Sequence, residues 1–258
     1  MTIISVDVAV GVAGITLSNG DTGNLFDAAF CGALLDAVQS CSANPAVRCI
    51  LIRSSGKDFS YGGNLRWLAN FGDRVHEAVQ EPVRLLNETI TCLRSADVPL
   101  VVAVQGVAAG GAVGLTACAD IVIAADNARF HAAFPGIGLS CDTGTSYFLP
   151  RLVGLRRAQQ FLLLNQTWRA KEALEAGLVT RVVPLGELGQ AAVGIAEALA
   201  SGPTIAFGEI RRLLCDPASL QWQLTAEAAG IARSSRSQDM RRAVDALLAK
   251  RTPTFLGQ

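Results

Sequence analysis

The segment VPLVVAVQGVAAGGA, from Val98 to Ala112, decides the fold class of this chain. A proline and a run of β-branched residues predict a buried strand at about residues 100–104. Glycines follow at positions 106, 110 and 111, so backbone N–H groups can approach a ligand closely before a helix that begins near Gly111. A strand, a glycine-rich turn and a helix in this order are typical of an α/β sheet.

The stretch from Val98 to Ala119 carries no charged residue and is long enough to cross a bilayer. However, Pro99, the β-branched run and four glycines suit a strand, a turn and a buried helix better than one continuous helix. We therefore expect no membrane span. The first 17 residues alternate like a pair of strands and lack a basic region followed by a long apolar run, so a signal peptide is not expected either.

Strand-like and helical patterns alternate on both sides of this segment. Strands are expected at residues 3–8, 12–17, 48–52, 121–124 and 179–183, and helices at residues 25–41 and 73–94. The alternation predicts an α/β core with parallel strands and crossover helices over residues 1–195. Residues 196–258 are expected to form a helical region that serves oligomerisation.

The composition narrows the function. Half of the 258 residues are hydrophobic, and Lys plus Arg balance Asp plus Glu at 22 each, so nucleic acid is not an expected partner. Seven cysteines, an odd number without CxxC spacing, indicate a reducing, cytoplasmic setting. Two histidines and no cluster of His, Cys and carboxylate ligands give no support for a metal site.

A second glycine turn, FSYGGNL at residues 59–65, also follows a buried strand. Two N–H donors that converge from two such turns would form an oxyanion hole, although tight turns with close helix packing are the simpler reading of the glycines alone. The first turn matches neither a phosphate loop nor GxGxxG. The segment GLSCD at residues 138–142 lacks the closing glycine of a nucleophile elbow, which argues against a serine hydrolase.

Taken in order, these pieces resemble the crotonase (enoyl-CoA hydratase/isomerase) superfamily over nearly the whole chain. The matching segments are NPAVR (44–48), KDFSYGGNL (57–65), VPLVVAVQGVAAGG (98–111), CADIVIAA (118–125), ARF (128–130), GL (138–139), FLPRLVG (148–154) and ALEAGLV (173–179). The resemblance implies a spiral of repeated strand-strand-helix units with a helical C-terminal section. It also implies an acyl-CoA thioester substrate, no tightly bound cofactor beyond the coenzyme A of that substrate, and a homotrimer or homohexamer.

The resemblance assigns roles to individual residues. The N–H groups of Gly63 and Gly111 would bind the thioester carbonyl and stabilise an enolate. The backbone of Tyr61 and Leu65 would hold the adenine of coenzyme A. Lys250 would reach the phosphates of coenzyme A, often from a neighbouring subunit, but it also suits a solvated helix end.

The chain departs from the hydratase pattern at both acid/base positions. The two glutamates of hydratases fall here at Gly114 and Phe134, whereas Asp142 matches the catalytic aspartate of several isomerases in the superfamily, including those similar to the ring-opening isomerase of phenylacetate breakdown and dienoyl-CoA isomerases. One carboxylate suffices for a 1,3-proton shift, and an apolar wall at Phe134 should raise the pKa of Asp142. Asp142 could instead cap a helix that begins near Gly144.

Other residues are secondary candidates. His131 and Tyr147 flank the expected acyl pocket, Trp67 and Phe71 are expected mainly to pack, and Cys141 with His131 is a weak candidate for a thiol nucleophile. The predicted function is enoyl-CoA double-bond isomerisation with Asp142 as proton shuttle. A hydratase, a crotonase-type hydrolase or C–C lyase, and a catalytically silent acyl-CoA-binding subunit are the alternatives.

Overall fold

The computed structural model describes residues 3–258 and contains two sheets. The larger sheet has the order β1-β2-β3-β4-β6-β9, with β1 antiparallel to β2 and the other pairs parallel. Its strands are β1 (Ile4–Ala9), β2 (Val12–Leu17), β3 (Cys49–Ser54), β4 (Leu100–Val104), β6 (Ile121–Ala125) and β9 (Arg181–Val183). The smaller sheet joins β5 (Val107–Ala109), β7 (Arg129–His131) and β8 (Thr167–Arg169).

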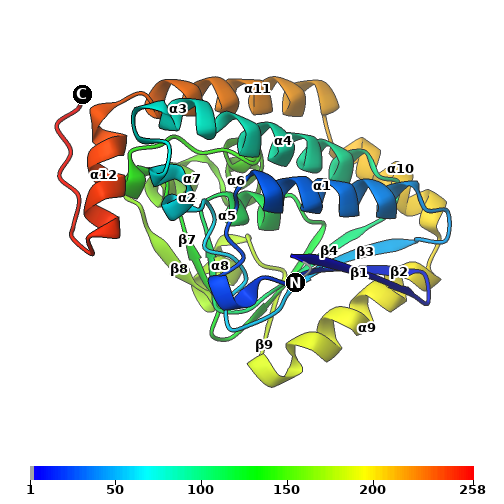
Figure 1. Cartoon of the computed structure of the whole chain (residues 1–258). Helices are drawn as coiled ribbons and strands as arrows, with labels where there is room; N and C mark the ends of the chain where they lie inside the picture. The colour runs from blue at the N-terminus through cyan, green and yellow to red at the C-terminus, as the bar shows by residue number, and fades with distance from the viewer. Residues whose placement is uncertain (1–2) are drawn as a thin grey trace.

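Helices cover both faces of the larger sheet (Figure 1). Because side chains alternate along a strand, Ile50 and Ile52 of β3 pack under α1 (Ala28–Ala43) and α4 (Gln80–Ser95), whereas Leu51 faces α9 (Leu188–Ser201). Every residue of β4 is buried. A strand that is covered on both faces must be apolar throughout, which accounts for the LVVAV run.

The chain winds as a spiral that supplies both sheets in turn. β4 of the large sheet leads to β5 of the small sheet and then to α5 (Gly111–Ala117), and β6 leads to β7 in the same way. The crotonase-type α/β fold is therefore confirmed. The uncharged stretch at residues 98–119 divides into β4, β5 and α5. Within residues 3–258 no single helix could cross a membrane, although the pair Leu185–Ser201 and Thr204–Leu214, bent by 104°, has the length and composition for it.

The expectation of one helix over residues 73–94 is wrong. The structure has the short helices α2 (Leu65–Ala69) and α3 (Val75–Ala78), a single turn at Gly72–Arg74, and then α4 from Gln80. Pro82 lies in the first turn of α4, where its missing N–H is tolerated, and a longer helix would have placed it in the interior.

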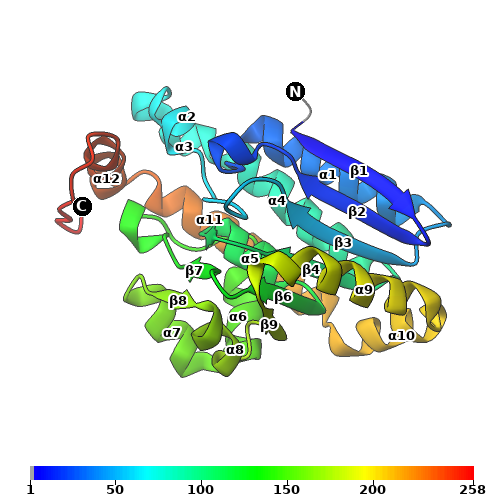
Figure 2. The same ribbon diagram turned by 90° about the horizontal axis from the view of Figure 1, so that it is seen from below.

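The C-terminal third is largely helical. α6 (Thr145–Val153), α7 (Leu155–Leu163) and α8 (Ala170–Ala176) precede β9, and α9 spans residue 195, where the core was expected to end. α10 (Thr204–Leu214), α11 (Pro217–Ser234) and α12 (Gln238–Leu248) follow. α11 packs on α4 and α6, while α12 contacts α2 and lies at the far end of the molecule (Figure 2).

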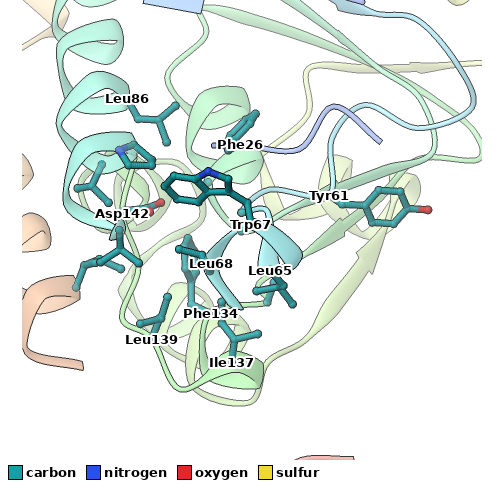
Figure 3. A pocket seen from close by; sticks show the side chains of 18 residues that line it. Phe26, Tyr61, Leu65, Trp67, Leu68, Leu86, Phe134, Ile137, Leu139 and Asp142 are labelled. Carbon is teal, nitrogen blue, oxygen red and sulfur yellow. The ribbon is translucent and has the colours of Figure 1, made fainter. Parts of the chain in front are cut away.

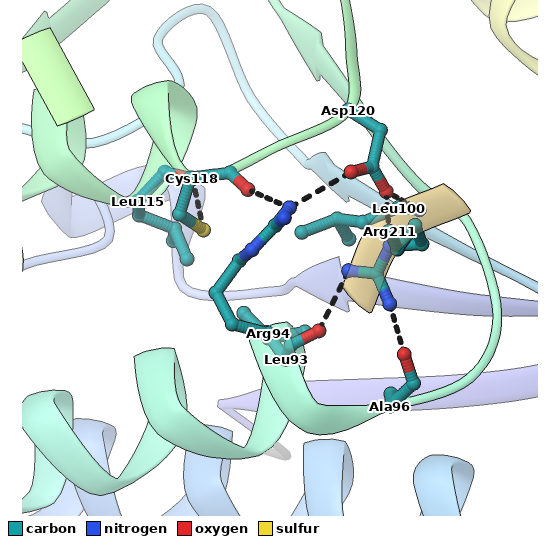
Figure 4. Close-up of polar contacts among 8 residues, drawn as sticks. All are labelled: Leu93, Arg94, Ala96, Leu100, Leu115, Cys118, Asp120 and Arg211. Carbon is teal, nitrogen blue, oxygen red and sulfur yellow. Dashed lines mark hydrogen bonds and ion pairs between the residues drawn. The ribbon is translucent and has the colours of Figure 1, made fainter. Parts of the chain in front are cut away.

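A buried ion-pair network ties α10 to the core (Figure 4). The Asp120 carboxylate accepts from Arg94 Nη1 at 2.8 Å, from Arg211 Nε at 2.7 Å and from the N–H of Leu100 at 2.8 Å. Arg211, only 5% exposed, also donates to the carbonyls at the end of α4, Leu93 and Ala96. One carboxylate thus compensates two guanidinium groups that have little contact with water.

Asp120→Asn should lower the free energy of unfolding by about 3 kcal/mol, because it leaves two buried guanidinium groups without a counter-charge. Urea denaturation gives this value. Asp97→Asn is the matched control, since its ion pair with Arg212 is solvent-exposed and should contribute much less to stability. Equal losses in the two variants would contradict a special role for the network.

Candidate active site

A cavity of about 130 Å³ lies where the two glycine turns meet α4 and α11 (Figure 3). Its wall is almost entirely apolar, and Asp142 is the only carboxyl among the described residues that line it. The lining residues are Phe26, Tyr61, Gly63, Leu65, Trp67, Leu68, Val79, Pro82, Val83, Leu86, Gly110, Gly111, Ala133, Phe134, Ile137, Leu139, Asp142 and Ile231.

The two glycine turns are held against each other by backbone contacts. The N–H of Ala109 donates to the carbonyl of Ser60 at 2.9 Å. A Cβ atom on Gly62, whose φ is +74°, would lie 2.5 Å from the carbonyl oxygen of Ala109, so only glycine permits this approach. Gly63 of one turn and Gly111 of the other line the same cavity, and their role as oxyanion donors stays a prediction.

Both predicted oxyanion donors face the cavity. Gly63 has no heavy atom within 4 Å of the position a Cβ would take, and Gly111 is the first residue of α5, so its N–H has no acceptor within that helix. Within residues 3–258, neither N–H has a hydrogen bond to a loop carbonyl or to a side chain. The two groups can donate to a ligand without breaking an existing contact.

Asp142 lies on a tight turn that packs against α5. Thr143 and Gly144 both have left-handed backbones, with φ of +57° and +73°. The Thr143 hydroxyl donates to Asp142 Oδ1 at 2.8 Å. A Cβ on Gly114 would lie 2.5 Å from the carbonyl oxygen of Thr143, so position 114 has no room for the glutamate of hydratases.

Burial sets the proton affinity of Asp142. The carboxyl faces an apolar cavity, and desolvation raises its pKa from 3.8 to about 7. The hydrogen bond from Thr143 lowers this pKa and the charge of Glu227 raises it, both to a smaller extent than burial. Phe134 forms part of the apolar wall, as expected. A carboxyl with a pKa near neutrality can both accept and return a proton.

Asp142 does not cap the following helix. The backbone N–H groups of Gly144 and Ser146, at the start of α6, donate to Glu227 Oε2 at 2.8 Å and Oε1 at 2.7 Å. The Ser146 hydroxyl donates to the same carboxylate at 2.6 Å. Glu227 comes from α11 and is 5% exposed. The capping alternative for Asp142 is therefore wrong, and its carboxyl is left to face the cavity.

Sequence reasoning missed Glu227. The sequence holds one weak indication of its role. Glu227 is the only acidic residue between positions 217 and 234, and its neighbours at 226, 228 and 229 are alanines. A lone charge among small apolar residues on a helix indicates a buried and paired group. Its partner could not be identified, because the turn that it binds lies about 80 residues earlier in the chain.

The predicted coenzyme A residues differ in their contact with the cavity: Tyr61 and Leu65 line it, whereas Lys250 does not. Leu65 lines the cavity at the start of α2. Tyr61 is 43% exposed; its ring points away from Asp142 in Figure 3, its hydroxyl bonds Asp58, and its N–H donates to Gly23. Lys250 is exposed beyond the end of α12 and does not line the cavity, so its role with coenzyme A stays a prediction.

The secondary candidates are less engaged with the cavity. His131 Nδ1 contacts the Thr167 hydroxyl at 2.9 Å, and burial raises the pKa of the Cys141 thiol to about 12, which disfavours a thiolate nucleophile. Tyr147 bonds the carbonyl of Asp216. Trp67 lines the cavity and packs edge-on against Phe71 with centroids 4.8 Å apart, so it does more than pack.

Comparisons with known proteins agree with this geometry. The sequence model of the enoyl-CoA hydratase/isomerase family matches residues 7–258. The chain is 32% identical to a 1,2-epoxyphenylacetyl-CoA isomerase of Escherichia coli, with 97% of each chain covered. It is 34% identical to a probable enoyl-CoA hydratase of Rhodobacter capsulatus, with 99% of this chain and 98% of the relative covered.

Solved structures show the same fold. An enoyl-CoA hydratase from Mycobacterium avium subsp. paratuberculosis superposes with a TM-score of 0.89 at 29% identity and 98% coverage of both chains. A protein from Mycobacterium abscessus, described as a putative enoyl-CoA hydratase/isomerase, superposes with a TM-score of 0.79 at 36% identity, covering 99% of this chain and all of the other.

Asp142→Asn should stabilise the protein in a pH-dependent way. The folded-state pKa of Asp142 is raised, so the stability that protonation contributes is complete at about pH 4 and is lost as the pH rises to about 7. Asparagine does not titrate. Relative to the parent, the free energy of unfolding of the variant should therefore rise by about 1–3 kcal/mol between about pH 4 and pH 8.

Urea denaturation of both proteins at several pH values measures this difference. Asp142 is half-buried, so the expected gain is smaller than the full pKa shift would give. A difference that stays constant with pH would contradict the raised pKa of the carboxyl.

Proposed function

Because the chain belongs to the enoyl-CoA hydratase/isomerase family and is therefore an acyl-CoA enzyme, we propose that it isomerises the double bond of an enoyl-CoA thioester. One observation carries the proposal: Asp142 is the only carboxyl among the described residues that line the cavity. Hydration calls for a group that orients water and a group that moves its proton, which paired carboxylates do well. A 1,3-proton shift needs a single base that removes a proton from one carbon and delivers a proton to another.

In the proposed reaction, the thioester carbonyl lies between the N–H groups of Gly63 and Gly111. Both donors come from the backbone and are held by contacts between the turns, so they need little reorganisation when negative charge develops on the oxygen. The apolar wall keeps water away from this charge and strengthens both hydrogen bonds. The oxyanion site therefore stabilises an enolate.

Asp142 then moves one proton between two carbons. Its carboxylate takes a proton from C2 of a 3-enoyl thioester, the electrons pass into a dienolate, and the carboxyl delivers a proton to C4 to leave the 2-enoyl product. No water and no second acid are consumed. A pKa of about 7 matches this task, because both protonation states are accessible near neutral pH. The relative from Escherichia coli is an isomerase by name, although of an epoxyphenylacetyl-CoA, whereas the probable hydratase supports the main alternative.

The proposal includes assembly and coenzyme A binding by several subunits. Ile205, Leu213 and Leu214 of α10 are 86%, 84% and 80% exposed, which supports an interface in a homotrimer or homohexamer. Lys250, which lies beyond the end of α12, would reach coenzyme A phosphates from a neighbouring subunit. The proposal assigns no tightly bound cofactor and a cytoplasmic location.

The test is proton NMR of 3-enoyl-CoA and 2-enoyl-CoA thioesters incubated with the protein in deuterated water. We expect double-bond migration, with deuterium at C2 or C4 and no 3-hydroxyacyl product. Asp142→Asn should retain KM while kcat falls by about 10²–10⁴-fold, because it removes the base and leaves the backbone donors in place.

The other outcomes identify the alternatives. A 3-hydroxyacyl product would make the protein a hydratase, and free coenzyme A or a cleaved carbon chain would make it a hydrolase or a C–C lyase. Binding of acyl-CoA without deuterium exchange at several chain lengths would indicate a silent subunit. Unchanged turnover in Asp142→Asn would remove Asp142 from the mechanism.

A further inference from the structure

The turn that carries Asp142 is strained. Thr143 has a left-handed backbone with φ of +57°, which is uncommon and energetically unfavourable for a β-branched residue. Such a conformation persists only where surrounding contacts impose it. On one side of the turn, Gly114 of α5 packs closely against the carbonyl of Thr143. On the other side, the hydrogen bonds come from Glu227 of α11.

Glu227 binds the C-terminal end of this strained segment and the start of α6. Its Oε2 accepts from the N–H of Gly144, the second left-handed residue, and its Oε1 accepts from the N–H and the hydroxyl of Ser146. The amide of Gln223, one turn earlier on α11, donates to the Ser146 hydroxyl at 2.7 Å and orients it. Glu227 does not line the cavity and has no access to a substrate there.

Few charged groups surround Asp142. Cys141 and Cys31 of α1 are thiols whose pKa burial raises, so both are neutral near pH 7. Asp27 caps α1 and accepts from the amide of Asn64, and its charge acts on Cys31. No charged side chain stands on α5 or in the first turn of α6 within the described chain. Glu227 is therefore the main charge that Asp142 meets.

The two carboxyls differ in hydrogen bonding. Glu227 accepts three hydrogen bonds, which favour its ionised form, and Asp142 accepts one from a side chain. Burial raises the pKa of both carboxyls, and the negative charge of Asp142 is less well compensated by hydrogen bonds than that of Glu227. A fixed negative charge on Glu227 thus keeps a proton on Asp142 at higher pH than burial alone would.

We propose that Glu227 is a positioning residue for the proton transfer: it holds the strained turn of residues 142–144 so that the Asp142 carboxyl faces the cavity, and it adds a buried negative charge to the surroundings of that carboxyl. The proposal rests on the proposed function for its kinetic consequences. Its electrostatic consequence is independent of any substrate.

The first experiment is a pH titration of the Asp142 carboxyl carbon by NMR, with ¹³C-labelled aspartate and Asp142→Asn to assign the signal. In Glu227→Gln the negative charge is gone, so the pKa of Asp142 should fall by about half a unit or more. Glu197→Gln, which removes an exposed charge on α9 at the opposite face of the sheet, should leave the titration unchanged. An equal titration in the parent and Glu227→Gln would overturn the proposal.

The second experiment is the pH dependence of isomerisation. In Glu227→Gln the acidic limb of kcat should move to lower pH, and kcat at its plateau should fall about tenfold or more with KM nearly unchanged, because the base is displaced while the backbone donors remain. Glu227→Asp keeps the charge but is too short to bind both N–H groups. It should lower kcat without moving the acidic limb.

A merely structural Glu227 would give a different result: loss of folded protein with an unshifted acidic limb in the fraction that remains. If Glu227→Gln does not fold, Ser146→Ala removes one of the three donors and keeps the charge, and kcat should fall several-fold at constant KM. Parental kcat in Ser146→Ala would then overturn the proposal. Absence of isomerisation in the parent protein would remove the proposed function, while the NMR titration would still test Glu227.

Discussion

The active site depends on one steric constraint: α5 must present bare backbone at Gly111 and Gly114 to the turn of residues 142–144. A Cβ on Gly114 would come within 2.5 Å of the Thr143 carbonyl, and one on Gly111 would lie 2.8 Å from the Thr143 hydroxyl. A larger side chain would displace the turn and the carboxyl with it. In this chain the turn that carries Asp142 therefore leaves no room for a glutamate at position 114 of α5.

The same packing explains the electrostatics of the site. With α5 against the turn and Phe134 in the wall, Asp142 loses most of its contact with water, and its pKa rises to about 7. A lone carboxylate in such a place would be unstable unless the turn were held firmly. Glu227 holds it with backbone hydrogen bonds, so it stabilises the turn and disfavours the charge on Asp142 at the same time.

Much of the fold and of the candidate site could be predicted from the sequence, because the glycine turns and strands that define them are local patterns. The glycine turns and the strands before them are short patterns with direct backbone meaning. Asp142 was instead identified from the family resemblance and from the missing carboxylates at positions 114 and 134. The break before α4 was missed because the apolar spacing of residues 73–94 continues through it, although Pro82 indicated it. The left-handed Thr143 has no sequence signal, because tertiary contacts impose it against its local preference.

Glu227 shows why the C-terminal helical section belongs to the site in this chain. α11 adds Ile231 to the cavity wall and a carboxylate to the turn behind it, and the network of Arg94, Asp120 and Arg211 fixes the preceding helix, α10, to the end of α4. Only five residues separate Arg211 from the start of α11 at Pro217, so the position of α11 is limited by that network. The buried ion pairs and the carboxyl that faces the cavity are thus connected through the helices α4, α10 and α11.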